Sequence, residues 1–427
     1  MQKLRLITLG CSKNTVDSEH LLAALSSVFE TVDDGRADVC LINTCSFIAD
    51  AKQQSIDTIL EAVALKADGV YGKVVVFGCL GERYAADMPG LIPEVDAWFG
   101  VRDFNPMLRY FGVDKVLRQS DRVLSTPSHY AYLKISEGCD RRCSYCAIPL
   151  IRGPHRSVPL EDLVEEARCL AGRGVKELIV IAQDSTYYGL DLYGERAIAR
   201  ALHALSEVDG IRWIRLHYSY PSSFPDDLLD EMAHNPKICK YIDIPLQHSS
   251  SKILRMMHRG IDEKETRALV DKFRKKVPGV VLRTTLIVGH PGETEEEFGN
   301  LLDFVRDERF ERLGAFTYSE EEDTFDALHY PDDVSPEEKS RRFDALMELQ
   351  EGISLEYNRS RIGTVEEVCI DSLRDGVYVC RSAGESPDVD GEILIKAPES
   401  GTEDLVGQFV KARITGADSY DLTAEFV

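Results

Sequence analysis

The sequence predicts an α/β multidomain protein: an N-terminal βαβ domain with a parallel sheet, a partial (βα)6 barrel and a small C-terminal all-β barrel of five strands. Three observations predict this fold. Strand and helix patterns alternate at the start of the chain, six further strand patterns alternate with helices in its middle, and its end holds only short strands between Gly and Asp turns. The 427 residues suffice for about three domains.

In the N-terminal domain, three strand patterns each end at a cysteine. The strands are expected at residues 4–9, 38–42 and 73–77, with helices at 16–25 and 49–67. Because ligand sites of open parallel sheets lie beyond the carboxyl ends of the strands, Cys11, Cys45 and Cys79 should meet at one edge as a metal site. Three coincidentally buried cysteines are the alternative. Cys40 falls inside a strand and is expected to pack in the core.

The barrel is predicted from six strand patterns, at residues 131–135, 177–181, 212–217, 241–246, 280–288 and 312–318. Helices are expected between them, at residues 160–171, 197–205, 226–233, 264–276 and 295–305. Chemistry in such barrels sits at the carboxyl ends of the strands. Polar residues gather there, although each one alone is more often a loop residue or a satisfied hydrogen-bonding group. The run 289–294 is expected as a tight turn in which Thr294 caps the next helix.

The C-terminal barrel is predicted from five short strand patterns, at residues 365–370, 376–380, 392–395, 408–414 and 420–426, which are typical of the oligonucleotide-binding type. Residues 361–427 hold 6 basic and 14 acidic residues, a formal net charge of −8, so we expect this surface to bind a basic protein. Cys369 and Cys380 are expected to pack in the core. We place the domains at residues 1–115, 130–335 and 361–427, with a linker at 116–129 and a connecting helix at 336–360.

The most informative motif is C-x3-C-x2-C, formed by Cys139, Cys143 and Cys146 on a loop just past the first barrel strand. Thiolates are soft ligands suited to zinc or iron–sulfur clusters. Zinc usually takes a fourth Cys or His, yet Cys169 lies in a helical pattern and His155 follows a proline. A four-iron cluster held by three cysteines would keep one open position for a ligand. A zinc knuckle or a disulfide is the alternative.

With Tyr145 directly before its last cysteine, this motif resembles the signature of radical S-adenosylmethionine (SAM) enzymes. The resemblance implies that the open iron binds SAM and that an electron from the cluster cleaves it to a 5'-deoxyadenosyl radical. Polar residues at the carboxyl ends of the strands would then line the SAM pocket. The candidates are Tyr145, Gln183, Asp184, Gln247 and Arg283.

Over its full length the chain resembles the radical SAM methylthiotransferase family, whose C-terminal barrel is called a TRAM domain. The resemblance rests on the runs Gly10–Asn14, Asp17–Glu19, Asn43–Cys45, Gly78–Cys79 and Asp243–His248. It implies two 4Fe-4S clusters, a radical one on Cys139, Cys143 and Cys146 and an auxiliary one on Cys11, Cys45 and Cys79. It also implies that SAM serves as both methyl donor and radical source.

Two substrates are common in that family, an adenosine of tRNA and the β-carbon of an aspartate in ribosomal protein twelve of the small subunit. The acidic tail and the runs Gly10–Asn14 and Gln183–Gly189 favour the protein-modifying branch, called RimO. The expected partners are that basic ribosomal protein, docked by the TRAM domain either free or on the assembling ribosome, and an external electron donor. A tRNA adenosine methylthiotransferase is the alternative within the family.

Composition bounds the remaining function classes. The net charge of −23 repels phosphate backbones, which makes tRNA an unfavourable partner. The chain starts without a signal-peptide pattern and has no apolar run of membrane-spanning length, so we expect a cytoplasmic protein without membrane contact. Eleven cysteines then indicate metal or redox use for some and burial for the rest. A non-catalytic iron–sulfur electron carrier and a zinc-stabilised RNA-binding protein are the alternatives from other classes.

Overall fold

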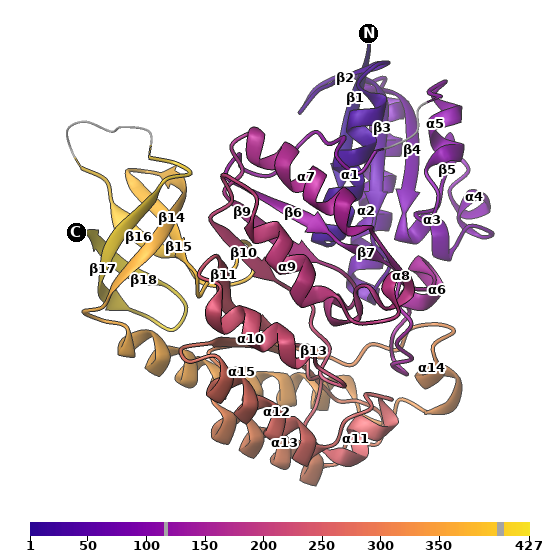
Figure 1. Cartoon of the computed structure of the whole chain (residues 1–427). Helices are drawn as coiled ribbons and strands as arrows, with labels where there is room; N and C mark the ends of the chain where they lie inside the picture. The colour runs from indigo at the N-terminus through magenta and orange to yellow at the C-terminus, as the bar shows by residue number, and fades with distance from the viewer. Residues whose placement is uncertain (115–117, 399–404) are drawn as a thin grey trace.

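The N-terminal domain is built on a parallel sheet with strand order β2-β1-β3-β4-β5 (Figure 1). The computed structural model describes residues 1–114, 118–398 and 405–427. The strands are β1 Gln2–Thr8, β2 Phe29–Thr31, β3 Ala37–Thr44, β4 Tyr71–Gly78 and β5 Ala97–Trp98. The helices are α1 Ser12–Leu25, α2 Ala49–Ala67, α3 Cys79–Arg83, α4 Met88–Leu91 and α5 Asn105–Tyr110. Separate apolar clusters cover the two faces of the sheet, one against α1 and α5 and the other against α2. The predicted parallel sheet is confirmed.

The central domain is an open sheet of six parallel strands in the order β13-β12-β11-β10-β9-β6, which confirms the partial barrel. Its strands are β6 Tyr130–Lys134, β9 Glu177–Ile181, β10 Trp213–Leu216, β11 Ile238–Asp243, β12 Val281–Val288 and β13 Arg312–Thr317. The crossover helices are α7 Leu160–Gly172, α9 Ile198–Ser206, α10 Asp226–His234, α12 Glu263–Lys276 and α13 Glu295–Glu308. Shorter elements are β7 Ser136–Glu137, α6 Ile148–Arg152, β8 Arg156–Ser157, η1 Ser185–Tyr187, α8 Leu190–Tyr193, α11 Ser251–Met256 and α14 Phe325–His329.

One strand of this sheet lies earlier than predicted. β11 ends at Asp243, whereas the sequence pattern placed its end at residue 246. Pro245 has no N–H group, so it cannot donate to β12. Beyond Asp243 the contacts with β12 are isolated ones: the amides of Ile244 and Gln247 each bind a carbonyl oxygen of β12, and the amide of Ile287 donates to the carbonyl oxygen of Gln247. The turn predicted at 289–294 is present, and Thr294 caps α13 in a reciprocal capping box with Glu297.

The two faces of the central sheet have opposite chemistry. The outer face and the crossover helices share one continuous apolar core. The inner face carries buried polar side chains instead, among them Glu177 on β9 and Arg215 on β10, which form an ion pair of 2.9 Å. Polar groups buried in this way need partners on the opposite side.

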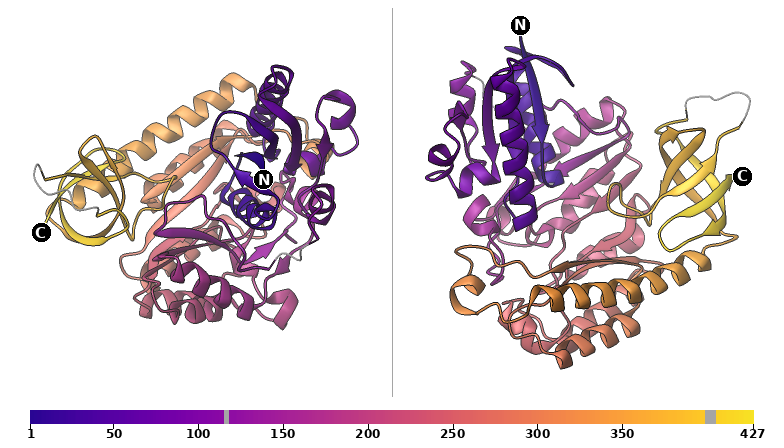
Figure 2. Two further views of the ribbon diagram at one scale, coloured as in Figure 1. Left: turned by 90° about the horizontal axis from the view of Figure 1, so that it is seen from above. Right: turned by 180° about the vertical axis from the view of Figure 1, so that it is seen from behind.

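The C-terminal barrel supplies those partners. It is closed in the order β14-β15-β16-β18-β17 and follows the long helix α15, Pro336–Ser360, which runs beside β13 (Figure 2). Its strands are β14 Val365–Arg374, β15 Val377–Ser382, β16 Ile393–Lys396, β17 Phe409–Ala417 and β18 Leu422–Phe426, which confirms the predicted five-stranded barrel.

The loop between β15 and β16 inserts into the inner face of the central sheet. We call residues 382–390 the plug loop. Arg215 donates to the carbonyl oxygen of Ala383 at 2.8 Å, and the Tyr241 hydroxyl donates to Asp390 at 2.7 Å. The imidazole of His217 lies 2.9 Å from the hydroxyl of Ser386. The C-terminal barrel is therefore an integral wall of the central domain.

The segment predicted as a linker lacks helix and strand between residues 118 and 129, and residues 116–117 lie outside the described residues. It is anchored rather than loose. The guanidinium of Arg122 is buried and bonded to Glu19 of the N-terminal domain and to Glu166 of α7. A buried arginine between two carboxylates fixes the relative position of the two domains.

Candidate active site

Three cysteines meet at the carboxyl edge of the N-terminal sheet, and we call them the N-terminal triad. Cys11 directly precedes α1, Cys45 directly follows β3, and Cys79 opens α3 after β4. Gly10, with φ of +89°, lets the chain pass close by, because a Cβ atom there would lie 2.8 Å from the Cβ of Cys45. Cys45 and Cys79 are buried whereas Cys11 is exposed, so the triad has one open side.

The second group, the central triad, consists of Cys139, Cys143 and Cys146 on the loop between β7 and α6, and all three are half-buried. The backbone N–H of Arg141 donates to the sulfur of Cys139 at 3.4 Å. Burial raises the pKa of the Cys139 thiol to about 12. Such thiols bind metal only by giving up their protons, so loading of this site should release them.

Two buried side chains contact the sulfur of Cys143. The guanidinium of Arg259 donates to it at 3.4 Å, and the Tyr220 hydroxyl lies 3.6 Å away. The same guanidinium lies 4.2 Å from the centre of the Tyr220 ring, a cation–π contact. Arg259 thus places a fixed positive charge beside the central triad.

The spacing of the sulfurs distinguishes the metals that the triads could hold. A zinc ion about 2.3 Å from each thiolate would bring the sulfurs within about 4.6 Å of one another. Among the described residues, only His129, Cys369 and Asp371 place three such ligand atoms within 4.8 Å, so neither triad is that tight. Two wider three-thiolate sites fit iron–sulfur clusters held by three cysteines.

The trio of His129, Cys369 and Asp371 has a different role. The imidazole of His129 lies 2.7 Å from a carboxylate oxygen of Asp371, and both nitrogens of the Arg381 fork bind the same carboxylate. Cys369 is fully buried where the C-terminal barrel packs on the central sheet, in line with the packing role predicted for it. The trio is therefore a hydrogen-bonded packing contact between domains.

The N-terminal triad faces the central domain across a buried ion network. Lys134, at the end of β6, pairs with Asp17 of α1, and Arg152 of α6 donates to the same carboxylate at 2.7 Å and to Glu137 at 3.0 Å. The guanidinium of Arg152 also reaches the sulfur of Cys79 at 3.6 Å. Burial alone would raise the pKa of Glu137, but Lys134 and Arg152 hold it at about 2. The network brings the two cysteine-bearing edges together.

Two of the predicted pocket residues, Gln183 and Tyr145, lie beside the central triad, and a third, Gln247, lies just past the end of β11. Gln183 donates to Glu137 at 2.6 Å, and the Tyr145 hydroxyl accepts from Arg259 at 3.4 Å. The side-chain oxygens of Gln183 and Gln247 are buried, and neither has a hydrogen-bond partner in the described part of the chain. Buried acceptors of this kind are available to the donors of a bound ligand.

The other two predicted pocket residues have protein partners. Asp184 accepts the backbone N–H of Thr186 at 2.9 Å and the guanidinium of Arg141 at 2.7 Å, so it caps η1. Arg283 pairs with Asp243 at 2.8 Å and approaches Asp390 of the plug loop at 3.6 Å. Both residues are therefore engaged by the chain itself.

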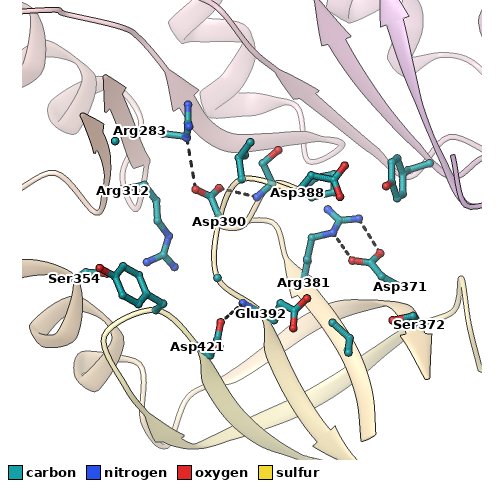
Figure 3. A pocket seen from close by; sticks show the side chains of 18 of the residues that line it. Arg283, Arg312, Ser354, Asp371, Ser372, Arg381, Asp388, Asp390, Glu392 and Asp421 are labelled. Atoms are coloured by element: carbon teal, nitrogen blue, oxygen red, sulfur yellow. Dashed lines mark hydrogen bonds and ion pairs between the residues drawn. The ribbon is translucent and has the colours of Figure 1, made fainter. Parts of the chain in front are cut away.

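Arg283 lines a cavity of about 690 Å³ between the central sheet and the C-terminal barrel (Figure 3). Arginines and carboxylates alternate around it, and Figure 3 shows Arg283 directed at Asp390 and Arg381 at Asp371. Of the described residues that line it, none is one of the six triad cysteines. Arg283 consequently borders a chamber distinct from the immediate surroundings of the cysteines.

Sequence reasoning missed several residues at this site, namely Glu137, Arg141, Arg152, Tyr220 and Arg259. Glu137 and Arg141 lie two positions before and after Cys139, and that proximity was a signal available in the sequence. Arg152 and Arg259 lie on short helical or loop segments whose pattern carries no information about distant thiols. Their roles depend on tertiary contacts.

Family models cover most of the chain. Residues 3–100 match the Uncharacterized protein family UPF0004, residues 133–305 match the Radical SAM superfamily, and residues 362–427 match the TRAM domain.

Curated relatives match over the whole chain, and the two described here are both named ribosomal protein uS12 methylthiotransferase RimO. The protein of Cytophaga hutchinsonii is 49% identical over 100% of this chain and 98% of its own length. The protein of Porphyromonas gingivalis is 50% identical over 100% of this chain and 99% of its own length. Among solved structures, the fold is similar to that of the radical S-adenosylmethionine methyltransferase TsrM from Kitasatospora setae, with a TM-score of 0.53 and 14% identity over 94% of this chain and 84% of that chain.

Proposed function

The chain belongs to the RimO family of ribosomal protein uS12 methylthiotransferases, and we infer that it is a radical SAM enzyme that transfers a methylthio group to ribosomal protein uS12. We take the acceptor to be the β-carbon of an aspartate, with SAM as both methyl donor and radical source. The tRNA-modifying alternative has no support from the curated relatives described above.

The two triads divide the cofactors between them. SAM and one 4Fe-4S cluster follow from the radical SAM family, and we assign that cluster to Cys139, Cys143 and Cys146. We propose a second 4Fe-4S cluster on the N-terminal triad, whose wide spacing and open side at Cys11 suit it. When bound, these groups supply hydrogen abstraction at the central site and the methylthio group at the N-terminal one.

The observation that carries the proposal is the buried network in which Arg152 bonds at once to Asp17 and Glu137 and reaches Cys79. A carbon radical must meet its sulfur before it is quenched, so the two sites must stay close and in fixed orientation. The side chains of Arg152 and Asp17 are each only 2% exposed, and their charge-assisted bond supplies that rigidity.

The SAM pocket is proposed around the central triad. The free side-chain oxygens of Gln183 and Gln247 would accept hydrogen bonds from the amino and hydroxyl groups of SAM. Tyr145 is linked to Cys143 because the guanidinium of Arg259 binds both the Tyr145 hydroxyl and the Cys143 sulfur. Asp184 would act indirectly, by holding Arg141 next to the Cys139 loop. Arg283 would contribute to the wall shared with the plug loop.

The C-terminal barrel is proposed to dock the basic substrate protein. Part of its negative charge is neutralised within the chain, because the carboxylates of Asp371, Glu385 and Asp390 are paired with arginines. Exposed carboxylates remain at Asp375 and Glu425, and these would attract a cationic partner.

The setting proposed for the reaction is the cytoplasm, where an external electron donor would reduce the central cluster. Across the described ranges, every helix is too short or too polar to cross a membrane. The uS12 named in the relatives belongs to the ribosome, which favours the same compartment.

The proposed function is tested by anaerobic reconstitution with iron, sulfide, SAM and reductant. The protein is offered purified uS12 or unmodified tRNA, and both are analysed by mass spectrometry. A methylthio adduct on an aspartate of uS12 is the expected result. An adduct on adenosine would show instead that the protein is a tRNA-modifying member of the family. Absence of SAM cleavage, with both clusters loaded and reducible, would leave an electron carrier as the better description.

A further inference from the structure

Arg152 belongs to the central domain but lies against the N-terminal triad. It ends α6, the helix that follows the central triad, and its Nη2 atom is 3.6 Å from the sulfur of Cys79. The same nitrogen donates to the side-chain oxygen of Asn14 at 2.5 Å, and the thiol of Cys79 lies 3.9 Å from that oxygen. Arg152, Asn14 and Cys79 therefore form one compact group at the edge of the N-terminal sheet.

The guanidinium is held in place from its other side. Its Nη1 atom binds Asp17 at 2.7 Å and Glu137 at 3.0 Å, and the side chain is only 2% exposed. The planar fork thus presents one fixed positive charge and one donor to the triad, with water excluded.

We propose that Arg152 is a positioning residue that donates a hydrogen bond to the Cys79 thiolate and sets the reduction potential of the cluster on the N-terminal triad, an inference that rests on the proposed second cluster. Hydrogen bonds to ligand sulfurs and nearby positive charge stabilise the reduced form of an iron–sulfur cluster and raise its potential. Because Arg152 is carried by α6, the central domain itself tunes the cluster of its neighbour.

The central triad has a matching contact. Arg259 is also buried and donates to the sulfur of Cys143 at 3.4 Å, which makes it the counterpart of Arg152 for the other cluster. Each triad therefore receives one buried guanidinium on one of its three sulfurs. This pairing gives the experiment an internal reference.

The test measures each cluster alone. In the full chain with Cys139, Cys143 and Cys146 replaced by Ala, only the N-terminal site should load, and its potential is measured by redox titration followed by electron paramagnetic resonance. Arg152→Gln removes the charge, and Arg152→Lys removes the fork. We expect both to move the potential to more negative values, the Gln variant further, with iron and sulfide content retained.

The reciprocal chain, with Cys11, Cys45 and Cys79 replaced by Ala, holds only the central cluster. There Arg259→Gln should lower the potential clearly and Arg152→Gln should lower it less. The proposal is overturned if a variant of Arg152 that keeps the N-terminal cluster has the potential of its parent. It also fails if both variants lose the clusters of both sites, because Arg152 would then be merely structural. Loss of the N-terminal cluster alone in both variants also overturns it, because Arg152 would then be needed to hold the cluster rather than to set its potential.

These measurements need no substrate. If uS12 acquires no methylthio group from the unsubstituted enzyme, the proposed function fails, whereas the potentials still report on Arg152. The two ideas are therefore separable.

Discussion

Arg83 and Glu321 form a buried ion pair, with 2.9 Å between Nη1 and a carboxylate oxygen, that joins the N-terminal domain to the segment after the last central strand. Arg83 ends α3, the helix that begins with Cys79, and it also donates to the carbonyl oxygen of Ser46 beside Cys45. The partner segment binds the central-triad loop, because the amide of Asp326 donates to the carbonyl oxygen of Ser144 at 3.0 Å. One ion pair thus lies between the two cysteine sites.

Glu321→Gln should leave Arg83 buried without its counter-charge and cost about 3 kcal/mol of unfolding free energy. Transfer to uS12 should fall more than SAM cleavage, since only transfer needs both sites in register. Chemical denaturation and the two assays check this. Glu322→Gln is the matched control, because Glu322 is 63% exposed in its pair with Lys52 and should cost under about 1 kcal/mol. Equal effects of the two substitutions would contradict the expectation.

Replacing any one of Cys139, Cys143 or Cys146 with Ala should abolish SAM cleavage, because it removes a ligand of the cluster that reduces SAM. Replacing Cys11, Cys45 or Cys79 should spare cleavage and prevent methylthio transfer. Liquid chromatography of 5'-deoxyadenosine and mass spectrometry of uS12 separate the two results. Cys40→Ala, in the N-terminal core, is the control that should retain both activities. Product formation after loss of Cys79 would refute the assignment of the N-terminal triad.

Gln247→Asn should weaken SAM binding about tenfold while leaving the fold intact. The position has φ of +76°, which Asn tolerates, and the shorter side chain withdraws the buried oxygen by one methylene. Equilibrium dialysis with SAM measures the loss. Asp184→Asn should act differently, by lowering the unfolding midpoint, because Asp184 caps η1 and holds Arg141. Unchanged SAM affinity in the Gln247→Asn variant would remove this residue from the pocket.

Truncation after residue 360 should disrupt the central domain and abolish SAM binding. Glu177, Arg215 and Tyr241 are buried against the C-terminal barrel and would lose partners there that no other described segment supplies. Calorimetry and SAM dialysis test this. The control carries Asp375→Lys and Glu425→Lys, at exposed positions of the same barrel, and should keep SAM binding while capturing uS12 less well. A truncated protein that binds SAM normally would show that the barrel is only a docking module.

His217 should make the protein sensitive to acid. Burial lowers its pKa from 6.5 to about 4, against the opposing charge of Asp243. The folded protein therefore stays neutral at this position while the unfolded chain takes up a proton, and stability present above pH 6.5 is lost as the pH falls toward 4, by at most about 3 kcal/mol.

His217→Asn should flatten this pH dependence of the unfolding free energy, although it removes the contact with Ser386 and lowers stability by about 1 kcal/mol at neutral pH. His203→Asn, on an exposed part of α9, should keep the acid sensitivity of the parent. If the profiles of the two variants coincide, His217 is not the group responsible.

Local patterns predicted the regular elements well because they depend on neighbouring residues. The helix predicted at 49–67 is α2 with the same bounds, and the cap at Thr294 is present. Three-residue β2 was missed because so short a strand carries almost no alternation. The cysteine positions followed from strand ends and from family resemblance. Their surroundings did not, since Arg152 and Cys79 are 73 positions apart.

Net charge is a similarly incomplete guide to the binding surface. The acidic C-terminal region looks like a free docking surface when its residues are counted, yet Glu385 and Asp390 point into the central sheet and bind Arg312 and Arg283. Net charge does not record where a carboxylate points. The polar inner face of the central sheet was not predicted either. In the sequence its polar residues resemble loop residues, and only the structure shows that the plug loop covers them.

The plug loop also has a consequence for biosynthesis. Arg215 of the central sheet donates to the carbonyl oxygen of Ser382 in this loop, and the two residues are 167 positions apart. The inner face of the sheet can therefore be covered only after nearly the whole polypeptide has left the ribosome. Contacts of such long sequence separation form late and slowly, and domains near the N-terminus fold first during synthesis. The nascent chain therefore passes through a stage in which the N-terminal domain is folded and the inner face of the central sheet is still uncovered.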